Sequence, residues 1–382
     1  MARILFIVPP LTGHINPTVS VGQILKKRGH RVAWVGHAGK LEKLLHEGSE
    51  LLALDDPMSA EDLQKLTDRS NQVRGLEGMK FLWQEFLIPL ARSMRQGVEA
   101  AVRRFKPDVL VTDQQALAGA IVGRKMGFRF VTFTTSSAGL VETPLPKVWN
   151  WVLNQLADLQ REAGLPVVRR PDISDDCMIV FTVKDLVGDL EYPVHYHLVG
   201  PSISERQEDV AFPWKELKKG PRLLVSLGTV NAERGGRFYQ KLLEVMADQP
   251  VQIILAAPRN TIEPVPDNFI VQEYLPQLAL LAHVNAVVCH AGQNTVSETL
   301  AHGLPLVVCP IKDDQGLVAT QVVQAGAAVR VRFGRLTAKD LEAAIWKVLK
   351  DDSYRLAAKK IQQSFQAAGG AEKAADIVEG MA

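Results

Sequence analysis

Two histidine-containing segments carry the side chains best suited to chemistry. In the first, residues 13–17 read Gly-His-Ile-Asn-Pro and follow the apolar run 3–8. Ligands bind at the carboxyl ends of strands in open α/β sheets, so His14 lies where a substrate is expected. An imidazole is also a suitable general base near neutral pH. The second segment, 290–298, follows the apolar run 286–289 and opens a helix.

This second segment has the features of a diphosphate site. The N-terminus of a helix presents N–H groups and a partial positive charge, which suit a phosphate. Gly292 lets the backbone approach a ligand closely, and His290 can donate to the same group. The neighbouring side chains that add donors are Asn294 and Thr295. Glu298 lies about one helical turn further along, where its carboxylate can accept from both hydroxyls of a ribose. The alternative is an ordinary strand-to-helix turn, with Asn294 as the N-cap and Glu298 on a solvated face.

Apolar runs and turn signals predict the elements that position these segments. Asn16 as an N-cap and Pro17 as the first helical residue predict a helix to about Arg28, which Gly29 ends. The predicted strands of the first half are 3–8, 31–35, 109–112, 128–132, 178–181 and 196–199. Those of the second half are 223–227, 251–255, 286–289 and 306–309, with helices near 235–248, 276–283, 294–302, 338–350 and from 354 onward.

Strands that alternate with helices in two series predict an α/β protein with two Rossmann-like domains that face a central cleft. The polar stretch 204–220 lies between Gly-Pro dipeptides and is interpreted as a linker. The first domain is then 1–203 and the second 221–382, whose last helices can pack back on the first. A helix with one wide apolar face covers 79–94 and is expected to bend near Pro89.

Composition excludes several classes of function. The chain has 44 basic and 42 acidic residues among 382, a net charge of +2, and offers no electrostatic footprint for nucleic acid. No apolar run is long enough to span a membrane. Three cysteines without a pairing pattern favour a reducing compartment, and we expect a cytoplasmic protein that is a monomer or weak dimer.

Several motifs in order along the chain resemble the UDP-glycosyltransferases of the GT-B superfamily, which include glucosyltransferases of natural products. They are Gly-His-Ile-Asn-Pro at 13–17, Ser-Leu-Gly-Thr at 226–229, Tyr-Leu-Pro-Gln at 274–277, the segment 290–298, and Asp-Asp-Gln at 313–315. The resemblance implies transfer of a hexose, most often glucose, from a UDP-sugar to a hydroxyl of a small lipophilic acceptor, with inversion.

The resemblance also implies roles for single residues. His14 would be the general base, and Asp113, which ends the run Val-Leu-Val-Thr-Asp, would orient it. Tyr274 stands where the family usually has a tryptophan that stacks on uracil, and Gln293 replaces another tryptophan. The donor-binding residues implied in this way are Gly13, Thr229, Tyr274, Leu275, Gln277, His290, Gly292, Gln293, Asn294, Thr295, Glu298, Asp314 and Gln315. The acceptor-binding candidates are Trp83, Phe86, Ser136 and Trp149.

Two further expectations concern the cofactor and the nucleotide. No Asp-x-Asp motif occurs, so the reaction is expected to need no metal or other cofactor beyond the UDP-sugar. A deoxyribose would leave one oxygen of Glu298 without its partner, which favours UDP over dTDP. The alternatives are a GT-B enzyme that uses UDP-GlcNAc, either a lipid-linked transferase or an epimerase, and a nucleotide-sugar sensor without turnover.

Overall fold

The computed structural model describes residues 1–55, 60–73, 75–141, 145–189, 191–203, 210–228, 235–258 and 261–382. It forms two compact units. Unit 1 comprises residues 1–182, 191–204 and 368–382, and unit 2 comprises 183–190 and 205–367. Among the helices of the described residues, none has the length and apolar character needed to cross a membrane.

The sheet of unit 1 is entirely parallel in its described pairings and has the order β3-β2-β1-β4-β5-β6-β7. Its strands are β1 (Arg3–Ile7), β2 (Arg31–His37), β3 (Glu50–Leu54), β4 (Val109–Asp113), β5 (Phe130–Thr134), β6 (Cys177–Val180) and β7 (Tyr196–Leu198). The direction of winding reverses between β1 and β4. The carboxyl ends of these two strands therefore flank the switch point where doubly wound folds bind ligands.

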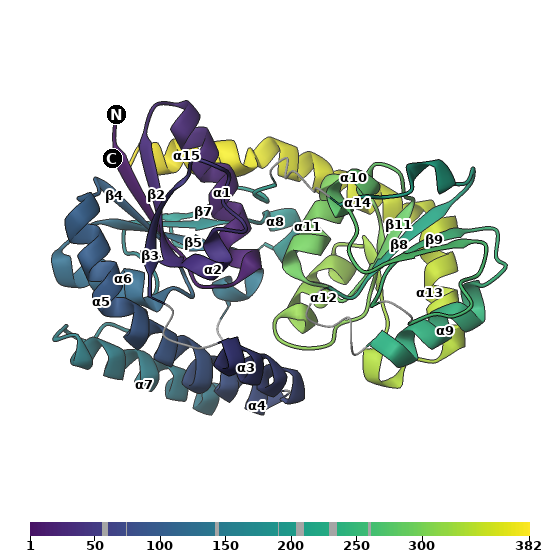
Figure 1. Ribbon diagram of the computed structural model, residues 1–382, viewed down its shortest axis with the longest axis horizontal. Coiled ribbons are helices and arrows are strands. Elements are labelled where there is room, and N and C mark those ends of the chain that lie inside the picture. Colours follow the sequence, from purple (N-terminus) through teal and green to yellow (C-terminus); the bar gives the residue numbers. More distant parts are fainter. Residues whose placement is uncertain are drawn as a thin grey trace. The chain divides into compact units, whose positions relative to one another are not determined.

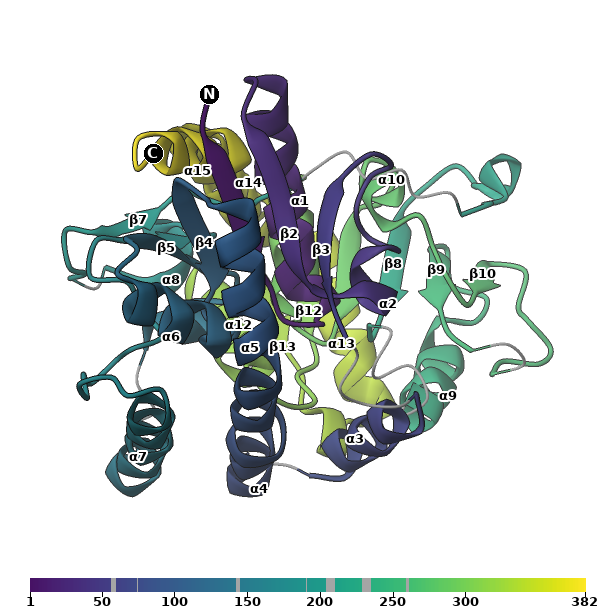
Figure 2. The same cartoon turned by 60° about the vertical axis from the view of Figure 1, so that its left-hand side comes forward.

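Helices cover both faces of this sheet. Helices α1 (Thr12–Lys27) and α15 (Gly370–Glu379) lie side by side on one face (Figure 1). Helices α5 (Ile88–Phe105) and α6 (Leu117–Met126) lie together on the other face (Figure 2). The remaining helices of unit 1 are α2 (Ala38–Leu41), α3 (Ala60–Gln72), α4 (Gly75–Lys80), the π-helix η1 (Phe81–Leu87), the 3₁₀ helix η2 (Ser137–Leu140) and α7 (Pro146–Glu162).

Two helix predictions in unit 1 need correction. Helix α1 begins at Thr12 and not after Asn16, because the N–H groups of His14 and Ile15 already bond to the carbonyl of Leu11. Pro17 therefore lies inside the helix and not at its first position. The predicted helix over 79–94 is irregular earlier than Pro89. Its π-helical turn is η1, and Pro89 belongs to the first turn of α5.

Unit 2 repeats the same winding. Its parallel sheet has the order β10-β9-β8-β11-β12-β13, with the reversal between β8 and β11. The strands are β8 (Arg222–Ser226), β9 (Gln252–Ala256), β10 (Phe269–Gln272), β11 (Ala286–Cys289), β12 (Leu306–Val308) and β13 (Ala328–Arg330). Helices α9 (Gly236–Met246) and α13 (Ala338–Lys350) lie side by side against it (Figure 1).

The other helices of unit 2 are short, except for the last. They are α8 (Lys184–Val187), the 3₁₀ helices η3 (Trp214–Glu216) and η5 (Phe333–Arg335), α10 (Gln277–Leu281), α11 (Gln293–Ala301), α12 (Gln315–Gln324) and α14 (Asp352–Ala368). Helices α11 and α12 contact each other, and each lies beside a strand, β11 and β13 respectively.

The two units interleave in sequence, because the chain passes from one unit to the other more than once. The last fifteen residues cluster with unit 1, where Ala374, Ala375 and Val378 of α15 are fully buried. Residues 183–190 cluster with unit 2. The described part of the predicted linker, 210–220, also packs there, since the ring of Trp214 lies 5.3 Å from that of His283. Residues 204–209 lie outside the described part of the chain.

Candidate functional site

In unit 1, the two predicted catalytic residues meet at the switch point. The Nδ1 atom of His14 lies 2.9 Å from Oδ2 and 3.0 Å from Oδ1 of Asp113. The carboxyl group is fully buried and the imidazole is 17% exposed. A carboxylate accepts but does not donate, so the geometry assigns the proton to Nδ1 and leaves the basic lone pair on Nε2. The pair thus has the arrangement of an oriented general base.

Strand alternation explains why these side chains meet. Val109 and Val111 of β4 face the layer formed by α1 and α15, and alternate residues of a strand share one face. Asp113, two residues beyond Val111, therefore points toward α1, whose first turn carries His14. Oδ1 of Asp113 also accepts from the N–H of Gln115 at 2.8 Å. One carboxyl group thus shapes the turn after β4 and holds the imidazole.

Thr135 is a residue at this site that sequence reasoning missed. It follows β5, the neighbour of β4, and its Oγ1 lies 3.0 Å from Nδ1 of His14. Its side chain continues the alternation of Val131 and Phe133, which also face α1. The signal in the sequence was this alternation, but it can be used only when β4 and β5 are known to be neighbours.

In unit 2, His290 lies at the equivalent switch point, directly after β11. A Cβ added to Gly292 would lie 2.4 Å from Nε2 of His290, and one added to Gly228 would lie 2.6 Å from its Cε1. Two glycines therefore make room for the imidazole. Burial lowers the pKa of His290 to about 4, an effect that the backbone of Ser226 opposes and the positive charge of Lys312 reinforces. The ring is neutral at pH 7 and contributes a donor without a charge.

Gly292 is the N-cap of α11, and among the described residues no side chain caps this helix end. The N–H groups of the first helical turn are those of Gln293, Asn294 and Thr295, so Asn294 is not the N-cap that the alternative interpretation required. Nε2 of Gln293 donates to the hydroxyl of Ser297 at 3.1 Å. Helix geometry thus supplies N–H dipoles at the carboxyl end of β11.

Glu298 is buried and not on a solvated face. Its Oε2 accepts from Nε2 of Gln277 at 2.6 Å, which joins two of the predicted donor-binding residues. Gln277 is the first residue of α10, and the preceding motif places Tyr274 at 59% exposure with Leu275 half-buried. An exposed aromatic side chain, a half-buried amide and a buried carboxylate are suited to a nucleoside.

The segment between β12 and α12, with the start of α12, contains two of the predicted donor-binding residues, Asp314 and Gln315. Asp314 is the N-cap of α12. The Oε1 atom of Gln315 accepts from the backbone N–H groups of Ile311 and Lys312, at 2.9 and 3.1 Å, so half of this amide holds its own loop. Lys312, also missed from the sequence, has a side chain only 6% exposed and lies 3.8 Å from the carboxylate of Asp313. Thr229 lies outside the described residues.

The acceptor-binding candidates belong to unit 1 and are mostly packed. Trp83 and Phe86 of η1 pack against the core between α5 and α7. Trp149 packs there too, with the guanidinium of Arg170 5.2 Å from its ring. Ser136 accepts from the N–H of Ala138 as the N-cap of η2. Of the four, only Ser136 directly follows a residue that contacts His14.

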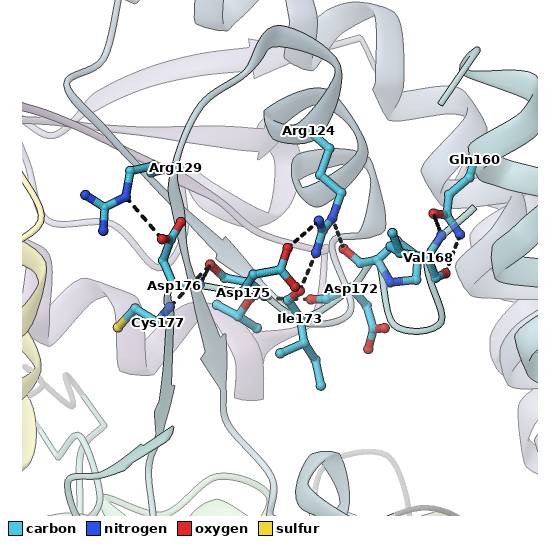
Figure 3. Close-up of polar contacts among 12 residues, drawn as sticks. Arg124, Arg129, Gln160, Val168, Asp172, Ile173, Asp175, Asp176 and Cys177 are labelled. Carbon is cyan, nitrogen blue, oxygen red and sulfur yellow. Dashed lines mark hydrogen bonds and ion pairs between the residues drawn. The ribbon is translucent and has the colours of Figure 1, made fainter. Parts of the chain in front are cut away.

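The segment 168–176 is held by hydrogen bonds and ion pairs and connects Arg170 with the neighbourhood of Asp113. Arg124 of α6 donates to the carbonyl of Ile173 at 2.7 Å and pairs with Asp175, as Figure 3 shows. This anchors Asp172, which pairs with Arg170 and accepts from Gln114 at 3.1 Å. Gln114 is the neighbour of Asp113 in the chain. The 168–176 segment therefore contributes to the surroundings of the carboxyl end of β4.

Comparison with known proteins shows the family of the chain. Residues 221–364 match the family described as UDP-glucoronosyl and UDP-glucosyl transferase. The 4'-demethylrebeccamycin synthase of Lentzea aerocolonigenes is 30% identical over 426 residues, which cover 100% of this chain and 99% of that protein. The chain belongs to the UDP-glycosyltransferase family. It is therefore a glycosyltransferase, as its motifs predicted.

Solved structures identify the fold of this glycosyltransferase as GT-B. CalG4, the calicheamicin glycosyltransferase, matches with a TM-score of 0.79 at 22% identity, covering 100% of this chain and 98% of that one. The glycosyltransferase VinC, solved in complex with dTDP, matches with a TM-score of 0.77 at 18% identity and covers 99% of each chain. The predicted fold class, two Rossmann-like domains of α/β type, is confirmed.

Proposed function

We propose that this glycosyltransferase transfers a hexosyl group, glucose in the first instance, from a UDP-sugar to a hydroxyl of a small lipophilic natural product. The observation that carries the proposal is the contact of His14 with the buried carboxyl group of Asp113 at 2.9 Å. A general base held in this way can remove the proton from the acceptor of a transferase when that acceptor is a hydroxyl. The names of the rebeccamycin and calicheamicin relatives support an acceptor of the natural-product class.

The proposed reaction is a single displacement. Nε2 of His14 takes the proton of the acceptor hydroxyl, whose oxygen bonds to the anomeric carbon. The bond from that carbon to the diphosphate oxygen breaks, and UDP leaves with the electron pair. Asp113 stabilises the imidazolium that forms, and the N-terminus of α11 with His290 stabilises the charge on the leaving diphosphate. An α-linked donor then gives a β-glycoside.

Two groups support the choice of UDP. The buried Glu298, held by Gln277, offers a carboxylate to the hydroxyls of a ribose. A deoxyribose would leave part of that acceptor capacity without a donor. VinC was solved with dTDP, so the donor test includes dTDP-glucose beside UDP-glucose.

We also propose that no metal takes part in the reaction, and adding EDTA should leave the rate of transfer unchanged. This proposal rests on the sequence, which contains no Asp-x-Asp motif.

The cellular setting of the proposed reaction is the cytoplasm. All three cysteines, Cys177, Cys289 and Cys309, are free and buried, which suits a reducing compartment. We propose a monomer or weak dimer there.

The experiment is an incubation of the enzyme with UDP-glucose or dTDP-glucose and a panel of hydroxylated aromatics, macrolides, sterols and carotenoids. A product heavier by one hexosyl group, with a β-anomeric coupling in its NMR spectrum, is expected from UDP-glucose. His14→Ala should lose most of this transfer, because His14 is the proposed base. It should still bind UDP, measured by calorimetry, because His14 is not one of the proposed nucleotide-binding residues. Transfer at the wild-type rate by His14→Ala would refute the base assignment.

A further inference from the structure

Thr135 shares one nitrogen of the proposed base with Asp113. Its Oγ1 lies 3.0 Å from Nδ1 of His14, and the two carboxyl oxygens of Asp113 lie 2.9 and 3.0 Å from the same atom. Thr135 and Asp113 are both buried. Asp113 is the last residue of β4, and Thr135 directly follows β5, the parallel neighbour of β4. Three oxygens on two elements thus surround one ring nitrogen.

Proton counting decides which way the threonine hydroxyl acts. Nδ1 carries the proton when it faces a carboxylate, because a lone pair in that position would oppose the negative oxygens. The hydroxyl cannot donate to a nitrogen that already bears a proton. Toward this nitrogen its oxygen can therefore only accept, and it shares the Nδ1 proton with the carboxylate of Asp113.

The Asp113 oxygens do not share this task equally. Oδ1 also accepts from the N–H of Gln115 at 2.8 Å. Oδ2 is the closer oxygen to His14, and its contact alone would allow the ring to pivot about one hydrogen bond. A second acceptor from β5 adds a fixed point that restricts this rotation.

We propose that Thr135 is a positioning residue for the reaction: its hydroxyl oxygen accepts from Nδ1–H of His14 and holds the imidazole so that Nε2 receives the acceptor proton. The inference rests on the proposed role of His14 as the base. A small misalignment of a base lowers the rate of the chemical step without weakening substrate binding. Loss of the Thr135 hydroxyl should therefore lower kcat, through the position of His14, without raising KM.

The variants are Thr135→Val, which removes the hydroxyl at nearly constant volume, and Thr135→Ser, which keeps it. Thr134→Val is the matched control, because Thr134 is also buried but donates to Oε1 of Gln114 at 3.2 Å and not to His14. The assay uses UDP-glucose with the panel acceptor that reacts fastest. Thr135→Val should lower kcat about tenfold, the size expected for loss of a hydrogen bond to a group that becomes charged. KM for UDP-glucose should stay unchanged, and Thr135→Ser should restore most of kcat.

NMR spectroscopy gives a second test that does not depend on turnover. Its first result comes from the wild-type enzyme, so it does not require Thr135→Val to fold. In ¹⁵N-labelled wild-type enzyme, the His14 signals, assigned by their loss in His14→Gln, should show the Nδ1-protonated ring. The Nδ1 signal should shift in Thr135→Val and stay in place in Thr134→Val. An Nε2-protonated ring in the wild type, an unmoved Nδ1 signal, or an unchanged kcat in Thr135→Val would overturn the inference. Wild-type turnover by His14→Gln would instead overturn the proposed function.

Discussion

Asp113→Asn isolates the charge of the carboxyl group from its shape. Asparagine keeps the size of the buried side chain, and its Oδ1 can still accept from the N–H of Gln115, so the turn after β4 remains. The negative charge beside the imidazolium is lost. A hydrogen bond to a charged group is worth about 1.5–3 kcal/mol, and two charges about 4 Å apart interact by about 4 kcal/mol at an effective dielectric constant near 20. A loss of about 2–4 kcal/mol in the transition state predicts a kcat about 30 to 1000 times lower.

The upper part of this range is expected because the new amide can donate to Nδ1 of His14. That contact favours the tautomer with the proton on Nε2, which cannot act as a base. The measurement is steady-state release of UDP with a saturating acceptor, together with UDP binding by calorimetry. The affinity for UDP should not change, since the proposed nucleotide-binding residues other than Gly13 belong to unit 2. A decrease in kcat of less than about threefold, with the fold and the affinity intact, would refute the pairing as the source of catalysis.

Two further predictions concern unit 2. Gly292→Ala should weaken UDP binding at least tenfold by calorimetry, because the new Cβ would lie 2.4 Å from Nε2 of His290 and must displace the ring; Gly334→Ala, where a Cβ meets nothing within 4 Å, is the control. Equal affinities in both variants would contradict this packing. Lys312→Met should raise the pKa of His290 from about 4, since a nearby positive charge disfavours the protonated ring, while burial keeps the pKa below 6.5. An NMR titration of His290 that gives the same or a lower pKa would be the contrary result.

The central strands were predictable because parallel strands covered on both faces form continuous apolar runs, such as 3–7 and 286–289. The strands that sequence reasoning missed are β3, β10 and β13, and each lies at the edge of its sheet. Edge strands are covered less completely, so their sequences carry a weaker pattern. In β3, for example, Leu54 is the one buried residue, and the other four residues of the strand are partly or fully exposed. The run Glu-Leu-Leu-Ala-Leu also follows a polar stretch, so it does not stand out as an apolar segment.

Local signals misplaced the start of α1 because a tertiary constraint outweighed them. Asn16-Pro17 is a strong N-terminal signal, yet the chain leaves β1 through Pro9-Pro10 and closes its first turn on the carbonyl of Leu11. The early start has a functional consequence. It places His14 on a rigid helical turn and not in a loop, which fixes the backbone that carries the proposed base.

The site residues missed from sequence share one cause. Motif spacing finds residues that are close along the chain, and it found His14 and the segment after β11. Thr135 and Lys312 become visible only when the order of the strands is known. Thr135 follows β5 and contacts His14, which follows β1, and β4 separates these two strands in the sheet. Lys312 follows β12, the neighbour of the strand β11 that precedes His290. Asp113 was found only because the family resemblance supplied its partner.

The near-zero net charge of the chain is compatible with the proposed diphosphate chemistry because the donors in unit 2 are local and mostly neutral. His290, with a pKa of about 4, donates a hydrogen bond without adding a charge at pH 7. The first turn of α11 adds N–H dipoles, and Lys312 is a single buried cation. Neutral donors directed at one point stabilise charge that develops there during bond cleavage. They attract a distant anion much less than a basic surface would, so the proposed site favours the leaving group without holding free UDP as tightly as clustered cations would.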